Sequence, residues 1–175
     1  MRKITNREVQ QMWRTINAIM PLESSPKFSY TLVVMRKRIV PVIEALAAAQ
    51  APPDAYTEYD KKRLELCRER AEKDDKGKPQ MAPGESGALE YVIQDMEAFN
   101  AEVEAMKVSD AHREAVEAYT KQLEDYEKLR DEEADVALMG LRFEDIPEGV
   151  TTAHMMGLQP LLEAGGAPPL EPEAD

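Results

Sequence analysis

The side chains best suited to acid–base, nucleophilic or metal chemistry are few in this chain: two histidines and one cysteine. His112 and His154 lie far apart, and neither belongs to a His-Glu-x-x-His sequence or accompanies paired cysteines, so no zinc site is indicated. Cys67 lies between Leu66 and Arg68 without a neighbouring histidine to activate it. We therefore expect His112 to be an exposed helix residue, His154 to lie on a helix surface, and Cys67 to be a small buried apolar residue.

The glycines and carboxylates also form no recognisable motif. The glycines have neither the Walker nor the dinucleotide-binding spacing that cradles phosphates. Carboxylates are abundant, but a general acid–base pair requires two of them held in different environments. The sequence thus predicts no catalytic, cofactor-binding or metal-binding residue, and we expect a protein without a cofactor that is not an enzyme.

Arg36, Lys37 and Arg38 form one basic cluster that could contact phosphates. The net charge is −12: residues 1–50 carry eight Lys or Arg and three Asp or Glu, whereas residues 51–175 carry fourteen and thirty-one. An excess of acid disfavours nucleic acid as the main partner, because phosphate binding requires an excess of Lys and Arg. We expect the cluster to pair with acidic segments of this chain or of a neighbouring copy, meeting head to tail.

The elements that must position these residues are mainly helices. An apolar stripe with steps of four and three residues predicts a helix over about 26–49, begun by Ser25 and Pro26 and interrupted by Pro41. That period is typical of a helix face packed against a partner. Similar patterns predict a helix over 5–20, capped by Thr5 or Asn6, and another over roughly 54–73.

The second half of the chain mixes helices with short extended segments. Turn formers near 74–87 predict a small hairpin from the 78–93 segment, and Asp95 predicts the start of the next helix. Residues 107–113 are polar, so that helix either continues exposed or breaks near Asp110. The segment 135–143 is predicted as a strand of the same small sheet, and Thr151 or Thr152 as the cap of a last helix.

These elements predict an α+β fold that is mainly α: a helical hairpin with long amphipathic helices and a small antiparallel β-sheet. We expect a single mainly helical domain over residues 1–164. Residues 165–175 form an acidic tail rich in proline and glycine, which we expect to be disordered without a partner.

Apolar and aromatic positions on two predicted helices are the best candidates for contact with another protein. The first group is Met12, Trp13 and Ile16, which could equally belong to the internal core. The second group is Tyr119, Leu123 and Tyr126. No apolar run approaches the roughly 20 residues needed to cross a bilayer, the N-terminus lacks the apolar middle of a secretory signal, and a single cysteine suits a reducing compartment. We expect no membrane partner and assembly in the cytoplasm.

With these segments in order, the chain resembles a family of small tailed-bacteriophage and prophage proteins, encoded among late virion genes and of unassigned biochemical role. The resemblance is carried by the AEKDDKGKP turn, the DMEAFN helix start at Asp95–Asn100, and the helix ending LQPLLE at Leu158–Glu163. It covers most of the chain in order through generic motifs. Relative to the short form of that family, residues 107–131 look like an inserted helical extension, and the acidic tail is also additional.

The resemblance implies no catalytic residues and a place in the virion, at the neck, the tail or the capsid surface. It leads us to expect a structural protein of a tailed phage that contacts other virion proteins and copies of itself. A transient assembly factor, such as a scaffold or tail assembly chaperone, is an alternative that suits the acidity and long helices equally well. A small nucleic-acid-binding regulator using the basic cluster is a third.

Overall fold

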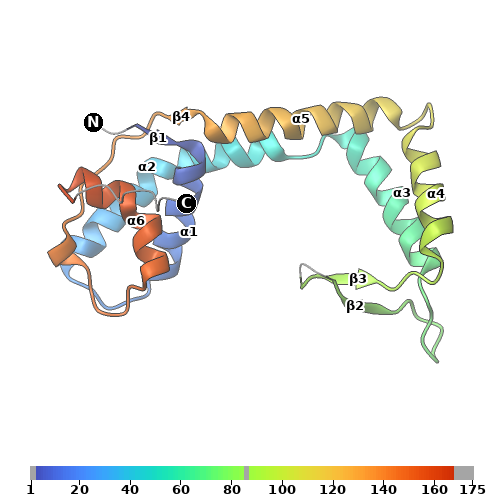
Figure 1. Ribbon diagram of the computed structural model, residues 1–175, viewed down its shortest axis with the longest axis horizontal. Helices are drawn as coiled ribbons and strands as arrows, with labels where there is room; N and C mark the ends of the chain where they lie inside the picture. The colour runs from blue at the N-terminus through green and yellow to red at the C-terminus, as the bar shows by residue number, and fades with distance from the viewer. Residues whose placement is uncertain (1–2, 85–86, 168–175) are drawn as a thin grey trace, which may run out of the picture. The chain divides into compact units, whose positions relative to one another are not determined.

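The computed structural model describes residues 3–84 and 87–167, and it confirms the expected α+β fold that is mainly α (Figure 1). Within these residues the chain is built from six α-helices and four short strands. In chain order the elements are β1 (Ile4–Thr5), α1 (Asn6–Ile19), α2 (Pro26–Gln50), α3 (Asp54–Arg70), β2 (Met81–Pro83), β3 (Leu89–Tyr91), α4 (Met96–Lys107), α5 (Arg113–Asp131), β4 (Glu133–Ala134), the short 3₁₀ helix η1 (Phe143–Asp145) and α6 (Thr152–Ala164).

The contacts group the chain into two compact units. Unit 1 is formed by Met1–Gln50 and Glu124–Asp175, and unit 2 by Ala51–Leu123. The sequence predicted one domain over residues 1–164; that boundary stays a prediction, and each unit is described by itself. Within the described residues no helix is long and apolar enough to span a membrane.

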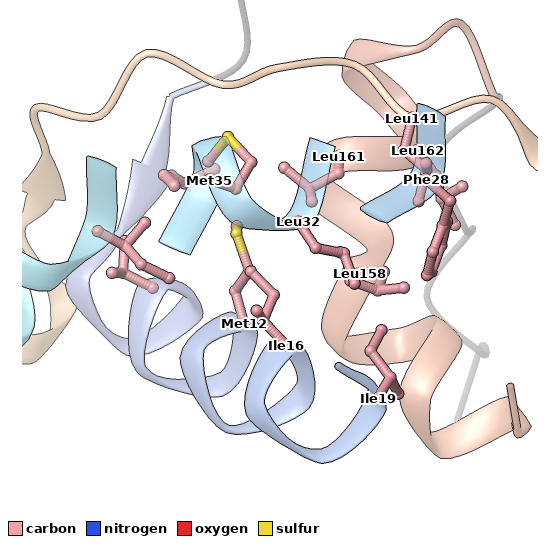
Figure 2. Close-up of a cluster of buried hydrophobic side chains, with 13 residues drawn as sticks. Met12, Ile16, Ile19, Phe28, Leu32, Met35, Leu141, Leu158, Leu161 and Leu162 are labelled. Atoms are coloured by element: carbon pink, nitrogen blue, oxygen red, sulfur yellow. The ribbon is translucent and has the colours of Figure 1, made fainter. Parts of the chain in front are cut away.

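The core of unit 1 lies between α1, α2 and α6, and its side chains are drawn in Figure 2. Helix α1 begins where Thr5 and Glu8 form a capping box, the side chain of each accepting the other's backbone N–H. The predicted stripe of α2 is buried at four successive positions, Phe28, Leu32, Met35 and Ile39, and α1 and α6 add facing residues. The fully buried members are Ile4, Val9, Met12, Ile16, Ile19, Phe28, Met35, Ile39, Leu141, Leu158 and Leu161. The stripe is therefore covered by helices of its own chain.

The segment 135–143, predicted as a strand of the hairpin's sheet, is not a strand. Strand β4 precedes it and pairs antiparallel with β1, whereas β2 pairs only with β3, so there are two separate two-stranded sheets in the described chain. The backbone of this segment bonds to helices instead: Leu141 N donates to Leu161 O at 2.8 Å, and Met139 N lies 3.2 Å from Met35 Sδ. Because α6 and α2 satisfy these groups, no neighbouring strand is required.

Unit 2 has a thinner core. Tyr59, Cys67, Ala71, His112 and Val116 are buried, while α4 has no fully buried residue. Helix α4 begins as predicted, with Asp95 Oδ1 accepting from Ala98 N at 2.9 Å. Helix α3 ends at Arg70, earlier than the predicted 73, because Ala71 has extended backbone angles and bridges to Ile93. The helix is interrupted between α4 and α5 near Asp110, which is one of the two predicted alternatives.

Candidate interaction surfaces

The three residues with the most reactive side chains all have structural contacts. His112 is 8% exposed, so the prediction of an exposed residue is wrong. It packs against Tyr59, and its Nε2 lies 3.4 Å from Lys62 Nζ, because α3 and the turn before α5 meet there. His154 caps α6, its Nδ1 accepting from Thr151 N, and Cys67 is buried as predicted. The described residues contain no group of three or more His, Cys, Asp or Glu arranged to hold a metal ion.

Two members of the basic cluster are engaged within the chain. The guanidinium of Arg36 lies 5.3 Å from the centre of the Trp13 ring, a cation–π distance. Arg38 donates to the carbonyl of Ala137 at 2.7 Å. Lys37 is exposed to solvent. The cluster therefore supports the packing of unit 1 on two sides of α2.

The first group of predicted contact residues divides between core and surface. Met12 and Ile16 are fully buried, so they cannot contact another protein in the folded chain; the alternative of an internal core applies. Both residues are buried because they lie on the face of α1 that packs against α2 and α6. Trp13, one position further round the helix, is only partly buried.

The second group divides between the two units. Tyr126 is buried in unit 1, while Tyr119 and Leu123 lie half-buried in unit 2. The Tyr119 ring lies 4.1 Å from that of Tyr56, between ring centres, and so forms part of the aromatic packing of α3 against α5.

Trp13 and Tyr126, predicted from different helices, meet at one groove of unit 1. This aromatic groove has a volume of about 190 Å³, and it is lined by Gln10, Trp13, Arg14, Ile43, Ala47, Gln50 and Tyr126. Tyr126 is held in place by Gln10, whose Nε2 donates to the phenol oxygen at 2.8 Å, and Arg130 Nε donates to Gln10 Oε1 at 3.1 Å. The groove therefore presents aromatic surface on a wall fixed by hydrogen bonds.

Beside the aromatic groove, α1 and α5 are joined by ion pairs. The hydrogen bond from Arg7 Nε to Asp131, at 2.9 Å, lowers the pKa of that carboxyl below its ordinary value. Arg130 does the same for the pKa of Glu127, with a smaller contribution from Arg7. The carboxylates are exposed, so the energetic effect of each pair is modest.

Replacing Arg7 by Gln is expected to make the free energy of unfolding depend less on pH in the acidic range. Because the pKa of Asp131 is lowered in the folded state, the pair stabilises the fold above the ordinary aspartate pKa, and this contribution is lost as pH falls through the lowered pKa. Urea unfolding should show that the unaltered protein is more stable than Arg7→Gln at neutral pH, and that this difference in the free energy of unfolding disappears in acid. Lys37→Gln removes a charge without a described partner and should leave the Asp131 midpoint in an NMR titration unchanged; an equally unchanged midpoint in Arg7→Gln would contradict the prediction.

A second groove lies on α6 and was not predicted from the sequence. This α6 groove has a volume of about 290 Å³ and is lined by Phe143, Thr152, Met155, Met156, Gln159, Leu162, Glu163 and Ala167. Phe143 is 70% exposed and Met156 56%, although both are large apolar side chains. An ion pair of 2.6 Å between Lys27 Nζ and Asp145 Oδ2 joins α2 to η1, the short helix that contains Phe143.

The hairpin of unit 2 exposes a third apolar surface. The register pairs Met81 with Tyr91 and Pro83 with Leu89, so all four side chains lie on one face of the two strands. Leu89 is 65% exposed and Met81 48%. Two-stranded hairpins are marginally stable alone, so a partner covering this face would stabilise the strands.

Comparison with known proteins adds no relative: no family model, no curated protein and no solved structure matches the chain.

Proposed function

We propose that this chain is a non-enzymatic structural protein of a tailed bacteriophage virion, at the neck, the tail or the capsid surface. In this proposal it is assembled in the host cytoplasm and acts in multiple copies through contacts with other virion proteins. The phage origin is supported by the sequence resemblance described above. Action through protein contacts is supported above all by the α6 groove, an apolar surface that residues 3–84 and 87–167 leave open.

The groove has the chemistry of a protein contact site. Burying a large apolar side chain is worth about 1.5–3 kcal/mol relative to leaving it exposed, and Phe143 and Met156 lie together at this site. Exposed apolar patches of this kind mark contact surfaces more often than isolated exposed side chains do. An aromatic and a methionine side chain are also the types enriched at the centres of protein interfaces.

The test is incorporation of a groove variant into particles. Phe143→Ala combined with Met156→Ala should reduce the amount of this protein in purified particles by about tenfold, which corresponds to roughly 1.4 kcal/mol of lost contact. Thermal unfolding should change little, because both side chains are exposed. Quantitative mass spectrometry of particles and a melting curve measure the two effects.

Tyr30→Ala provides the matched control, because Tyr30 is 62% exposed in the same unit but does not line the groove. It should enter particles normally. If the unaltered protein were absent from mature particles, the proposal would be overturned in favour of a transient assembly factor. If the double variant entered particles like the control, the α6 groove would not be the contact site.

A further inference from the structure

We propose that the aromatic groove binds the acidic, proline-rich segment at residues 168–175 of a second copy of this chain. The proposal deepens the proposed function by naming one partner, and it depends on that function only in requiring that copies meet. Three observations carry it: the aromatic lining of the groove, the arginines in and near that lining, and the composition of the segment.

Aromatic grooves are suited to proline. Proline-rich segments adopt the extended polyproline conformation with little loss of entropy, and they dock on Trp and Tyr side chains. The segment reads Pro-Pro-Leu-Glu-Pro-Glu-Ala-Asp, and it contains the spacing Pro169-x-x-Pro172. Trp13, which is partly exposed, provides the main aromatic surface, and the more deeply buried Tyr126 also lines the groove, together with the apolar side chains of Ile43 and Ala47.

The charges of groove and segment are complementary. Arg14 is the charged residue in the lining of the groove, it is exposed, and it forms no ion pair with the residues that the structure describes. Arg36 adds a second cation against the Trp13 ring. The nearby carboxylate of Glu127 is already paired, with Arg130 at 2.8 Å and with Arg7 at 3.4 Å. The segment carries Glu171, Glu173 and Asp175 and has no Lys or Arg.

The choice of a second copy is supported by the separate linings of the two grooves and by the uneven charge of the chain. The described chain reaches the segment through Ala167, which lines the α6 groove, whereas the lining of the aromatic groove comes from α1, α2 and α5 alone. Groove and segment are thus different surfaces, and a contact between them in neighbouring copies is heterologous. Such a contact produces a ring where the rotation closes and a filament where it does not. The basic residues 1–50 and the acidic remainder of the chain favour the same head-to-tail pairing.

Trp13 is the single tryptophan of the chain, so its fluorescence reports directly on this groove. With the full chain at low salt, we expect the Trp13 emission to shift with protein concentration, in parallel with association measured by sedimentation velocity. Arg14→Glu, and separately Glu171→Lys with Glu173→Lys, should each weaken self-association about fivefold to tenfold, because each places like charges together. Lys61→Glu makes the same change of net charge as Arg14→Glu at an exposed position of α3, and it should associate like the unaltered chain.

Mixing the two charge variants gives the decisive result. The Arg14→Glu chain keeps an intact segment and the double-lysine chain keeps an intact groove, so the two variants should associate with each other more tightly than either associates with itself. Absence of this complementation would overturn the proposal, and so would self-association that is unchanged in both variants. A Trp13 emission that changes in the double-lysine variant but does not depend on protein concentration would also overturn it, because it would indicate that the segment binds within one chain. None of these outcomes alters whether the protein is found in particles, so the proposed function is tested separately.

Discussion

Replacing Phe28 by alanine is expected to lower the free energy of unfolding by about 3–5 kcal/mol, the range for a phenylalanine deleted from a packed core. Phe28 is fully buried in the cluster drawn in Figure 2, together with Leu141, Leu158 and Leu162. Its side chain comes from the first turns of α2, where Ser25 Oγ accepts from the Phe28 backbone at 3.2 Å. Because its neighbours in this cluster come from α6 and from the segment at Leu141, the cavity left by truncation cannot be filled by a movement within α2 alone.

Urea unfolding followed by circular dichroism measures this loss. Phe143→Ala is the matched control, because it deletes the same side chain at a position that is 70% exposed, and its stability should change by no more than about 0.5 kcal/mol. Equal losses in the two variants would contradict the assignment of Phe28 to the core and of Phe143 to the surface. The same pair separates the two roles of phenylalanine here, since only the Phe143 change should reduce entry into particles without reducing stability.

Replacing Gly165 by alanine is expected to destabilise unit 1 by about 1–3 kcal/mol, as overpacking of a fixed contact does. A Cβ at this position would lie 2.1 Å from the carbonyl oxygen of Leu141 and 2.6 Å from its carbonyl carbon. The backbone angles of Gly165 are ordinary right-handed helical ones, so the cost comes from the contact and not from the conformation. The opposing atoms belong to backbone held by the bond from Leu141 N to Leu161 O, so they cannot move aside cheaply.

Gly157→Ala provides a graded comparison. A Cβ there would lie 1.9 Å from Thr15 Oγ1, which is the end of a side chain, although Thr15 Cβ at 2.8 Å would also have to give way. Alanine inside α6 also gains about 1 kcal/mol of helix propensity over glycine. Melting curves should therefore show a smaller loss for Gly157→Ala than for Gly165→Ala. A larger loss of stability for Gly157→Ala would contradict this prediction, because it would mean that the backbone at 140–141 moves aside more readily than Thr15 of α1.

The helices could be predicted from the sequence because their signals are local. Apolar periodicity and caps at Thr5, Ser25, Asp95 and Thr151 placed α1, α2, α4 and α6 correctly to within a few residues. The hairpin also followed from local turn formers around its tip. The strand expected at 135–143 was wrong because alternation of apolar residues shows only that a segment is extended. Whether another strand or a helix end satisfies its backbone depends on residues far away in the chain.

The candidate sites were harder to predict for the same reason. Trp13 and Tyr126 were identified as contact residues on separate helices, but nothing in the sequence indicated that Gln10 would join them. The α6 groove was missed altogether, since Phe143 and Met156 are apolar residues in short segments that could equally have been buried. The pair of methionines in α6 and the phenylalanine before the Pro147–Gly149 turn were the available signals, and neither specifies exposure.

The sequence by itself determined which segments are helical, the mainly α class of the fold, and the excess of acid beyond residue 50, because each depends on neighbouring residues or on composition. Only the tertiary structure decided that Met12 and Ile16 are core, that His112 is buried, and that Phe143 remains exposed. Burial depends on what covers a side chain, and here the covering elements come from distant parts of the chain. An amphipathic helix therefore shows which face will be covered, while the identity of the covering surface is decided when α1, α2 and α6 pack together.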